Sequence, residues 1–341
     1  MVNIGIIGLG YWGPNLLRNF YQLSEVRVCE CCDLRREKLE YVKNSYPTVR
    51  ISEDYLYMLN NPEVDAIVVA TPPLTHYRIA KQALLHNKHV LVEKPLVLES
   101  KRAQELINIA EKKDKVLMVG HTFEYNAAVR KIKEYLKSGI VGDIYYIYAQ
   151  RLNLGRVRQD VNVMWNLAPH DISIVLYWLE EEPFQVAAKG ITQLQKGLED
   201  VVFMNLDFSG GKSVHIHVSW IDPNKVRQIT IVGSEKMIVY DDTSPDAKVQ
   251  IFDKGITRQT LNNNLGKYDD FGKFQLIKRA GDILIPQINF LEPLSIECSH
   301  FIECIQDGKR PLSDGEDGLR VIRILEAAEK SLKARGIPVE V

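Results

Sequence analysis

The sequence predicts an α/β protein with two domains. The first is a doubly wound parallel sheet over residues 1–120, and the second is an α+β domain with an open, largely antiparallel sheet over residues 121–341. Up to residue 120, short apolar runs alternate with helix-like segments, the order that gives parallel strands joined by right-handed crossovers. Beyond it, longer runs of alternating apolar and polar residues are separated by glycine and serine, which is typical of antiparallel hairpins.

The first half contains five apolar runs of the length of buried strands. These runs are Asn3–Ile7, Val26–Cys32, Asp65–Ala70, His89–Glu93 and Val116–Val119. Helices are expected between them over Asp33–Tyr46, Thr75–His86 and Ser100–Lys113. Because parallel strands bring their carboxyl ends to one edge of the sheet, a ligand is expected at that edge.

A glycine motif joins the first run to the first helix. Gly8, Gly10 and Gly13 follow the run, and Tyr11 and Trp12 lie inside the motif. Gly8 suits a tight turn, Gly10 lets the backbone approach a pyrophosphate, and Gly13 lets the helix and strand pack closely. The helix N-terminus offers free N–H groups to phosphates. Three glycines can simply mark a loop, but the flanking elements favour a Rossmann dinucleotide site that includes Tyr11 and Trp12.

The choice of cofactor depends on Asp33, at the end of the second run. Its carboxylate can accept hydrogen bonds from the adenosine ribose hydroxyls and should repel a 2′-phosphate. Arg35 and Arg36 follow closely and could tolerate that phosphate. NAD is therefore the expected cofactor, and NADP is less favoured.

Two further strand ends should meet at the same edge, after Ala70 and at Glu93. The cofactor contacts expected there are Thr71, Pro72, His76, Glu93 and Lys94. A lysine is ordinarily a solvated surface charge, but the position of Lys94 makes it a site candidate. Pro95 fixes the backbone that follows and could form a cis bond.

The second half changes in rhythm. Helices are expected over Tyr125–Ser138 and from Asp171 to Leu179, with a strand over Asp143–Leu152 between them. The later strands are expected over Asp200–Phe208, Lys212–Trp220, Val226–Val232, Lys236–Tyr240 and, at the sheet edge, Val249–Phe252. Residues 257–285 are polar and are expected to form a long loop. The closing helices are Pro293–Gln306 and a second one with an apolar stripe from Leu319 to Leu332.

Composition limits the partners. The formal net charge of −1 gives no basic field for nucleic acid or an anionic membrane, and the apolar runs are too short to span a bilayer. The first strand begins so early that no signal peptide fits before it, so the protein is expected in the cytoplasm. The five cysteines lack zinc-site spacing and are expected as small apolar core residues. No metal is expected.

Three features together resemble the Gfo/Idh/MocA family of oxidoreductases, which includes glucose–fructose oxidoreductase and inositol dehydrogenase. They are Gly8-x-Gly10-x-x-Gly13, Glu93–Lys94–Pro95, and His170 preceded by Asn166–Pro169. The resemblance covers essentially the whole chain. It implies a Rossmann domain, a larger open-sheet domain and a substrate bound between them over the nicotinamide. It also implies homodimers or homotetramers formed through the exposed face of the second sheet.

The resemblance implies that Lys94 contacts the reacting hydroxyl and that His170 is the catalytic histidine. A protonated lysine stabilises a developing alkoxide, and a histidine titrating near neutrality suits the base role. A helix beginning around Pro169–Asp171 would keep His170 neutral; a helix-capping or core histidine is the alternative. Many members carry an aspartate where this chain has Asn166, and an asparagine can position a group but cannot relay a proton.

The stretch Trp165–Asp171 looks most like members that act at C3 of a nucleotide-linked hexose, of the UDP-N-acetylhexosamine type. The expected substrate contacts are Lys94, His121, Tyr125, Asn126, Arg151, Asn166 and His170. A capped helix start is the alternative for the residues from His121 to Asn126.

Arg151 and Arg156 flank a strand end and could meet a substrate phosphate or carboxylate, but a solvated pair is the favoured interpretation. His215 and His217 could bind a metal, but alternating sheet packing is favoured. For the whole chain, a free polyol or monosaccharide dehydrogenase and a catalytically silent, dinucleotide-sensing regulator stay open as alternatives.

Overall fold

The computed structural model describes residues 1–155, 157–255 and 279–341, and the chain divides into two compact units. Unit 1 comprises Met1–Asn126 and Leu291–Glu326; unit 2 comprises Ala127–Phe290 and Ala327–Val341. The sequence placed everything after residue 120 in the second domain, whereas 291–326 belongs to the first unit. The reason is packing that joins distant segments, since the ring of Phe301 meets that of Phe20, with centroids 6.3 Å apart.

Unit 1 is built on a parallel sheet of six strands in the order β3-β2-β1-β4-β5-β6. The strands are β1 (Val2–Ile7), β2 (Val26–Cys32), β3 (Arg50–Ser52), β4 (Ala66–Val69), β5 (His89–Glu93) and β6 (Leu117–Gly120). The order runs outward from β1 in both directions, which is the predicted doubly wound arrangement. The sequence missed β3, because its three residues are only partly buried or exposed and show no apolar run.

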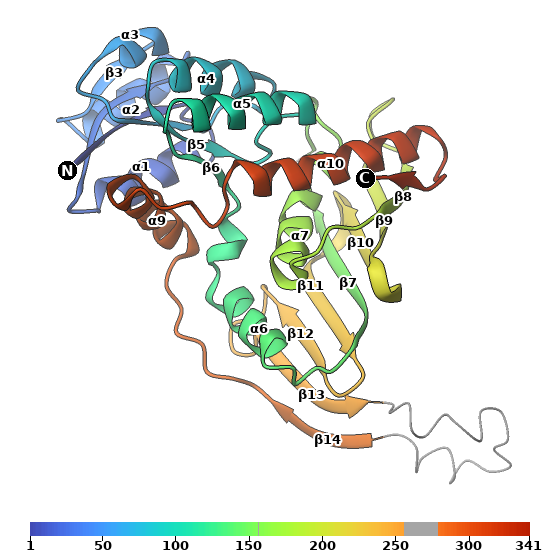
Figure 1. Cartoon of the computed structure of the whole chain (residues 1–341). Coiled ribbons are helices and arrows are strands. Elements are labelled where there is room, and N and C mark those ends of the chain that lie inside the picture. Colours follow the sequence, from blue (N-terminus) through green and yellow to red (C-terminus); the bar gives the residue numbers. More distant parts are fainter. Residues whose placement is uncertain (156, 256–278) are drawn as a thin grey trace, which may run out of the picture. The chain divides into compact units, whose positions relative to one another are not determined.

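The helices of unit 1 connect and cover this sheet. They are α1 (Gly13–Tyr21), α2 (Arg36–Ser45), α3 (Tyr55–Asn60), α4 (Pro73–Leu85), α5 (Ser100–Lys112), the 3₁₀ helix η1 (Thr122–Tyr125), α9 (Pro293–Asp307) and α10 (Gly315–Lys333), whose end continues into unit 2. Helix α4 packs beside α5, and α1 packs beside α9 (Figure 1). Ile4, Val68 and Leu91 of the central strands are at most 1% exposed, so the core lies along the sheet.

The turn between β1 and α1 is tight at two of its three glycines. Gly8 has a φ of +95°, and a Cβ there would lie 2.8 Å from the backbone carbonyl of Ala70. A Cβ on Gly13 would lie 2.1 Å from the carbonyl oxygen of Gly8, so helix and loop can approach this closely only without a side chain. A Cβ on Gly10 would have no atom within 4 Å. Packing therefore requires Gly8 and Gly13, and leaves the space over Gly10 open.

Unit 2 is built on a nine-stranded sheet in the order β14-β13-β12-β11-β7-β10-β9-β8-β15. The strands are β7 (Ile144–Leu154), β8 (Gln185–Ile191), β9 (Val201–Asp207), β10 (Ser213–Ser219), β11 (Ile221–Gly233), β12 (Met237–Asp241), β13 (Val249–Gly255), β14 (Arg279–Leu284) and β15 (Val339–Glu340). Among the strands that the structure describes in this unit, only β7 and β10 pair in parallel, so the sheet is largely antiparallel, as predicted. The helices among the described residues of unit 2 are α6 (Ala127–Lys137) and α7 (Val163–Leu179), and the short turn η2 (Ser209–Gly211) joins β9 to β10.

Helix α7 begins eight residues before the predicted start at Asp171. Asn162 caps it, since its side-chain oxygen accepts the Trp165 N–H at 3.1 Å. The sequence suggested a boundary at Pro169, which in fact lies inside the helix. A proline lacks only one N–H, and burial of most of α7 outweighs the loss of that single hydrogen bond.

The edges of the second sheet also differ from the prediction. The predicted loop over 257–285 is wrong for its end, because Arg279–Leu284 forms β14; residues 256–278 lie outside the described part of the chain. Strand β13 was expected at the edge, but β14 pairs with its outer side. Strands β8 and β15 were missed, since β15 has two residues and β8 is exposed over its last three.

Among the described residues, no helix combines the length and apolar character needed to cross a membrane. All five cysteines are buried and none forms a disulfide. Burial raises the pKa of the Cys304 thiol to about 11. These thiols are therefore protonated core side chains at neutral pH.

We expect Gly13→Ala to lower the free energy of unfolding by about 1–3 kcal/mol, because its methyl group would overlap the Gly8 carbonyl. Gly10→Ala is the matched control and should change that free energy by less than about 0.5 kcal/mol, since its methyl group enters open space. Urea unfolding followed by circular dichroism measures both. Equal stability of the two variants would contradict this account of the turn.

Candidate active site

The carboxyl ends of β4 and β5 are tied together by a buried histidine. The ring of His76, 1% exposed, places Nε2 2.7 Å from the Thr71 carbonyl oxygen and Nδ1 2.9 Å from the Pro95 carbonyl oxygen. The Thr71 hydroxyl accepts a hydrogen bond from Thr75 at 2.7 Å. Both ring nitrogens lie against backbone carbonyls, and the expected contact of His76 with a cofactor stays a prediction. The ring therefore links the segment that follows β4 to the segment that follows β5.

Asp33 occupies the end of β2 and reaches back to the glycine turn. Its carboxylate accepts the Leu9 N–H at 2.6 Å and forms a two-point pair with the Arg35 guanidinium at 3.0 and 3.1 Å. Burial alone would raise the pKa of Asp33, but hydrogen bonds from Arg35 and from the Leu9 N–H lower it below its usual value. Asp33 is therefore an ionised acceptor beside the glycine turn. Arg35 is bound to it, while Arg36 is 83% exposed and 3.9 Å from Glu40.

Lys94 follows β5 directly and is partly exposed, and its bond to Pro95 is cis. The carboxylate of Glu93 accepts the backbone N–H of Lys94 at 3.3 Å. Glu93 is 8% exposed, and burial raises its pKa to about 7, against the opposing charge of Lys94. The Lys94 side chain thus begins at the carboxyl end of the parallel sheet, next to a carboxyl group that titrates near neutrality.

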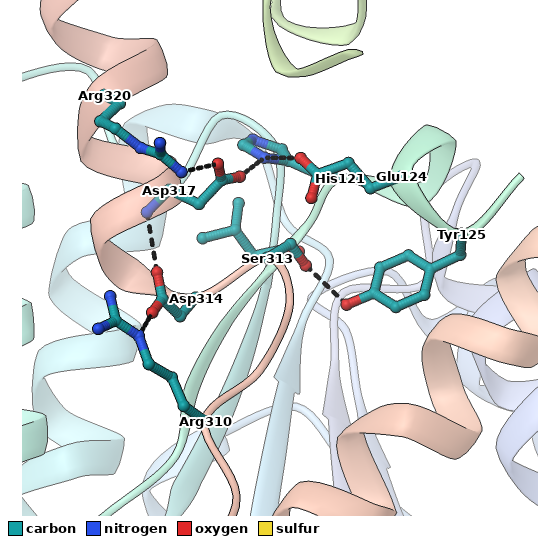
Figure 2. Close-up of polar contacts among 9 residues, drawn as sticks. His121, Glu124, Tyr125, Arg310, Ser313, Asp314, Asp317 and Arg320 are labelled. Carbon is teal, nitrogen blue, oxygen red and sulfur yellow. Dashed lines mark hydrogen bonds and ion pairs between the residues drawn. The ribbon is translucent and has the colours of Figure 1, made fainter. Parts of the chain in front are cut away.

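A buried triad lies after β6. Figure 2 shows His121 between Asp317 and Glu124, with Nδ1 2.6 Å from Asp317 Oδ2 and 3.4 Å from Glu124 Oε1. Asp317 also accepts a hydrogen bond from the Arg320 guanidinium at 2.7 Å. The loop before α10 runs along β6, since the Ser313 carbonyl accepts the Val119 N–H at 2.8 Å. That contact brings α10 close enough for Asp317 to reach His121.

The charges of this triad are set by its burial together with the contacts among its three members. Burial alone would lower the pKa of His121, but Asp317 and Glu124 raise it to about 10. Burial and the nearby Asp317 raise the pKa of Glu124 well above its usual range. The three ligand atoms lie within 4.8 Å of one another, a group that could hold a metal ion. Two ligands of one tetrahedral ion are about 3 Å or more apart, so the 2.6 Å contact is that of an imidazolium–carboxylate hydrogen bond.

Tyr125 and Asn126 were predicted, with His121, as substrate contacts. Tyr125 is fully buried, and its hydroxyl lies 3.0 Å from that of Ser313 (Figure 2). Asn126 is 3% exposed, and its backbone N–H donates to the Phe123 carbonyl. These side chains therefore take part in the packing of unit 1, and their contact with a substrate stays a prediction.

In unit 2, Arg151 forms a buried ion pair with the residue that follows His170. Its guanidinium donates two hydrogen bonds of 2.9 Å to the carboxylate of Asp171, and the two side chains are 6% and 1% exposed. The favoured interpretation of a solvated arginine is therefore wrong for Arg151, and its contact with a substrate stays a prediction. Arg156 lies outside the described residues. The pair links α7 to β7 at the residue that directly follows His170.

His170 and Asn166 lie one turn apart on α7, and both are partly exposed. The Asn166 side-chain oxygen accepts a hydrogen bond from the Trp220 indole at 3.2 Å. The argument that a helix N-terminus keeps His170 neutral is wrong, because α7 begins at Val163 and the field of a helix end fades within its first turn. A capping role for His170 fails for the same reason.

His215 and His217 pack against Phe203 of the neighbouring strand, with ring centroids 6.3 and 4.3 Å from that of Phe203. His215 Nδ1 lies 2.8 Å from the Asn205 side-chain oxygen. The favoured interpretation of sheet packing agrees with this geometry.

Sequence reasoning missed three buried acids of unit 1: Glu124, Glu297 and Asp317. Glu297 and Asp317 lie on helices α9 and α10, far along the chain from the strand ends that they meet; His121 and Asp317 are separated by 196 positions. No local spacing marks these two. Glu124 stood inside the stretch that the sequence singled out, and its position three residues after His121 is the signal that could have found it.

The triad predicts a pH-dependent stability. The His121 pKa of about 10 lies above the value of about 6.5 for an unfolded histidine. Its stabilisation is therefore complete below about pH 6.5 and is lost as the pH rises towards 10. We expect the free energy of unfolding to fall by roughly 1–3 kcal/mol over that range, and His121→Gln to remove most of this decline. Urea unfolding between pH 6 and 10 measures it.

His89 supplies a control of opposite sign. Burial lowers its pKa to about 4, and its Nδ1 accepts the Val116 N–H at 3.0 Å. Its contribution is therefore present above about pH 6.5 and lost as the pH falls towards 4. His89→Gln should flatten only this acid limb. A His121→Gln variant with the wild-type alkaline slope would contradict the role given to the triad.

Comparisons with known proteins agree with this architecture. Residues 2–121 match the model for the oxidoreductase family with an NAD-binding Rossmann fold, Gfo/Idh/MocA, and residues 129–239 match the model for the C-terminal domain of that family. The myo-inositol 2-dehydrogenase of Thermotoga maritima is 23% identical, over 98% of this chain and 97% of its own length.

A second relative is more similar over a shorter stretch. The UDP-N-acetylglucosamine 3-dehydrogenase of Acidithiobacillus ferrooxidans is 34% identical over 55% of this chain and 57% of its own. Its solved structure superposes with a TM-score of 0.80 at 22% identity and covers 98% of both chains, which shows a common fold. With both family models matched in order along the chain, this protein belongs to the Gfo/Idh/MocA family of NAD-binding oxidoreductases.

Proposed function

We propose that the protein is an NAD-dependent dehydrogenase acting on a secondary alcohol of a sugar, C3 of a nucleotide-linked hexose of the UDP-N-acetylhexosamine type. Lys94 and His170 are its catalytic residues. The reverse reaction, reduction of a keto-sugar, uses the same groups.

The observation that carries the proposal is the position of Lys94. Its side chain begins at the carboxyl end of β5, and β4 lies between β5 and β1 in the sheet. The glycine turn follows β1 and contacts the end of β4 at Ala70 and Thr71. In a doubly wound sheet this edge is where a dinucleotide and its substrate bind. An amino group there is suited to donate a hydrogen bond to a reacting oxygen.

The residues around the glycine turn fit a dinucleotide. The space over Gly10 is open, whereas Gly8 and Gly13 are closely packed, so the backbone at Gly10 is accessible to a pyrophosphate. The ionised Asp33 beside the turn suits the ribose hydroxyls and disfavours a 2′-phosphate. NAD, when bound, supplies the hydride acceptor.

The chain supplies the remaining chemistry. As the hydride leaves carbon, the proton of the hydroxyl group passes to the imidazole of His170. The Lys94 ammonium donates to the same oxygen and stabilises its developing negative charge. Asn166, one turn before His170, positions a hydroxyl or the imidazole by hydrogen bonding.

The relatives support two substrate classes. The nucleotide-sugar class rests on the relative that is 34% identical over half of this chain. A free polyol is the second candidate, because the myo-inositol 2-dehydrogenase relative matches over nearly the whole length. Thermal-shift measurements with UDP-sugars and with free cyclitols or hexoses, each in the presence of NAD, separate the two classes. Stabilisation by UDP-sugars alone favours the first.

We expect Lys94→Ala to lower kcat by about 10²–10³-fold, because the developing alkoxide loses its charged donor. Affinity for NADH, measured by fluorescence titration, should change little. Lys101→Ala, an exposed lysine on α5, is the control and should retain wild-type turnover. A wild-type rate in Lys94→Ala would contradict the proposed role of Lys94 in the reaction.

We expect NADH to bind more tightly than NADPH, since the Asp33 carboxylate opposes a 2′-phosphate. Asp33→Ser removes this charge and releases Arg35, so the ratio of the NADPH to the NADH dissociation constant should fall by roughly 10–100-fold. Fluorescence titration with both cofactors measures the ratio. Tighter binding of NADPH by the wild-type protein would overturn the preference.

A further inference from the structure

Two buried carboxyl groups converge over Gly120, the last residue of β6. A Cβ on Gly120 would lie 3.3 Å from Glu93 Oε2 and 3.4 Å from Glu297 Oε1. Glu93 ends β5, and Glu297 comes from α9, so the pair joins two segments of unit 1 that are distant in sequence. A Cβ at position 120 would be in tight contact with both carboxyl groups, which would have to shift by a few tenths of an ångström.

The burial of Glu297 is not matched by hydrogen bonds of normal geometry within the described part of the chain. It is 0% exposed, and neither of its carboxyl oxygens has a hydrogen-bonding partner of normal geometry among the described residues. An unpaired carboxylate in such a place is strongly disfavoured, and a carboxylic acid much less so. Glu93 differs, since one of its oxygens accepts the Lys94 N–H.

We propose that Glu297 is a positioning residue of the active site: it retains a proton on the Glu93–Glu297 pair and, through Glu93, sets the negative charge beside Lys94. This inference rests on the proposed function of Lys94. The proton stays on the pair and is not consumed in the reaction. At neutral pH the pair then carries less than its full charge of two carboxylates next to the lysine.

The electrostatics of the surrounding elements agree. Burial, with the nearby Glu93, raises the pKa of Glu297 to about 8, while the Thr122 hydroxyl and His121 act in the opposite direction. Burial raises the pKa of Glu93 to about 7, against Lys94 and His121.

The other titratable groups close to Glu297 are Tyr125 of η1 and Cys298 of α9. The pKa of each is raised well above its usual value by burial and by Glu297. Both are therefore neutral in the physiological range. The pair itself is the group that titrates there, and its two ionisations belong to the pair rather than to either residue.

The test compares Glu297→Gln with Glu303→Gln, an exposed glutamate on the same helix. The first readout needs no substrate. Infrared spectra at neutral pH should show protonated carboxylic-acid absorption, to which the buried Glu124 also contributes. The difference between Glu297→Gln and the wild type should show the loss of one such band, whereas the difference between Glu303→Gln and the wild type should show none. Persistence of the full band in Glu297→Gln would overturn the inference.

The second readout is the pH profile of kcat/KM between pH 5.5 and 9.5. The wild-type profile should bend between about pH 7 and pH 8, and Glu297→Gln should move that bend by about one unit to lower pH, because Glu93 loses its acidic neighbour. Glu297→Asp keeps a carboxylic acid and should restore part of the wild-type profile. An unchanged profile in Glu297→Gln would show a merely structural role and overturn the inference.

The two proposals fail in different ways. If the infrared band is lost in Glu297→Gln but Lys94→Ala keeps the wild-type rate, the carboxyl pair stands, while the proposed function and the role beside Lys94 fall together. If Lys94→Ala is inactive while Glu297→Gln changes neither the band nor the profile, the proposed function stands and this inference falls.

Discussion

The structure of unit 1 depends on a constraint of parallel sheets: their strands all end at one edge, and the polar groups that follow must be satisfied there. Three sets of contacts satisfy the polar groups at this edge. The glycine turn after β1 packs against the end of β4 without side chains. His76 lies between the carbonyls that follow β4 and β5. His121 after β6 is paired with Asp317. Each set of contacts holds the residues that follow a strand end, and Lys94 lies between two of these points, directly after β5 and before Pro95.

Several ionisable side chains are buried at this edge of the sheet. Five ionisable side chains near β5 and β6 are almost fully buried: Glu93, His121, Glu124, Glu297 and Asp317. The direction in which each pKa shifts depends on the groups that contact it. His121 gains two carboxyl partners and stays protonated, whereas Glu297 has none of normal geometry and tends to stay neutral. Charge near Lys94 is thereby limited, although several ionisable residues crowd the region. For an enzyme that stabilises a developing negative charge on a substrate oxygen, an excess of carboxylates at this point would be unfavourable.

Unit 2 places its candidate base by a different means. His170 lies within α7, and the buried pair of Arg151 and Asp171 holds that helix on β7. The field of a helix end does not act on His170, so its behaviour as a base depends on its neighbours, among them Asn166 one turn away. The two family models show that the protein is an NAD-binding oxidoreductase of the Gfo/Idh/MocA family. The sugar on which it acts is part of the proposed function.

The sequence by itself determined the features written in local patterns: the alternation of strands and helices in unit 1, the order of the three glycines, the acid at the end of β2 and the place of Lys94 after β5. Contacts between distant segments were decided only by tertiary structure. The residues 291–326 joined unit 1 through ring packing of Phe301 on Phe20, and Asp317 met His121 from 196 positions away. Glu297 came to lie over Gly120, and Arg151 paired with Asp171. Periodicity reports which face of one element is buried, but it does not report which element covers that face, and the partners of buried charges depend on this.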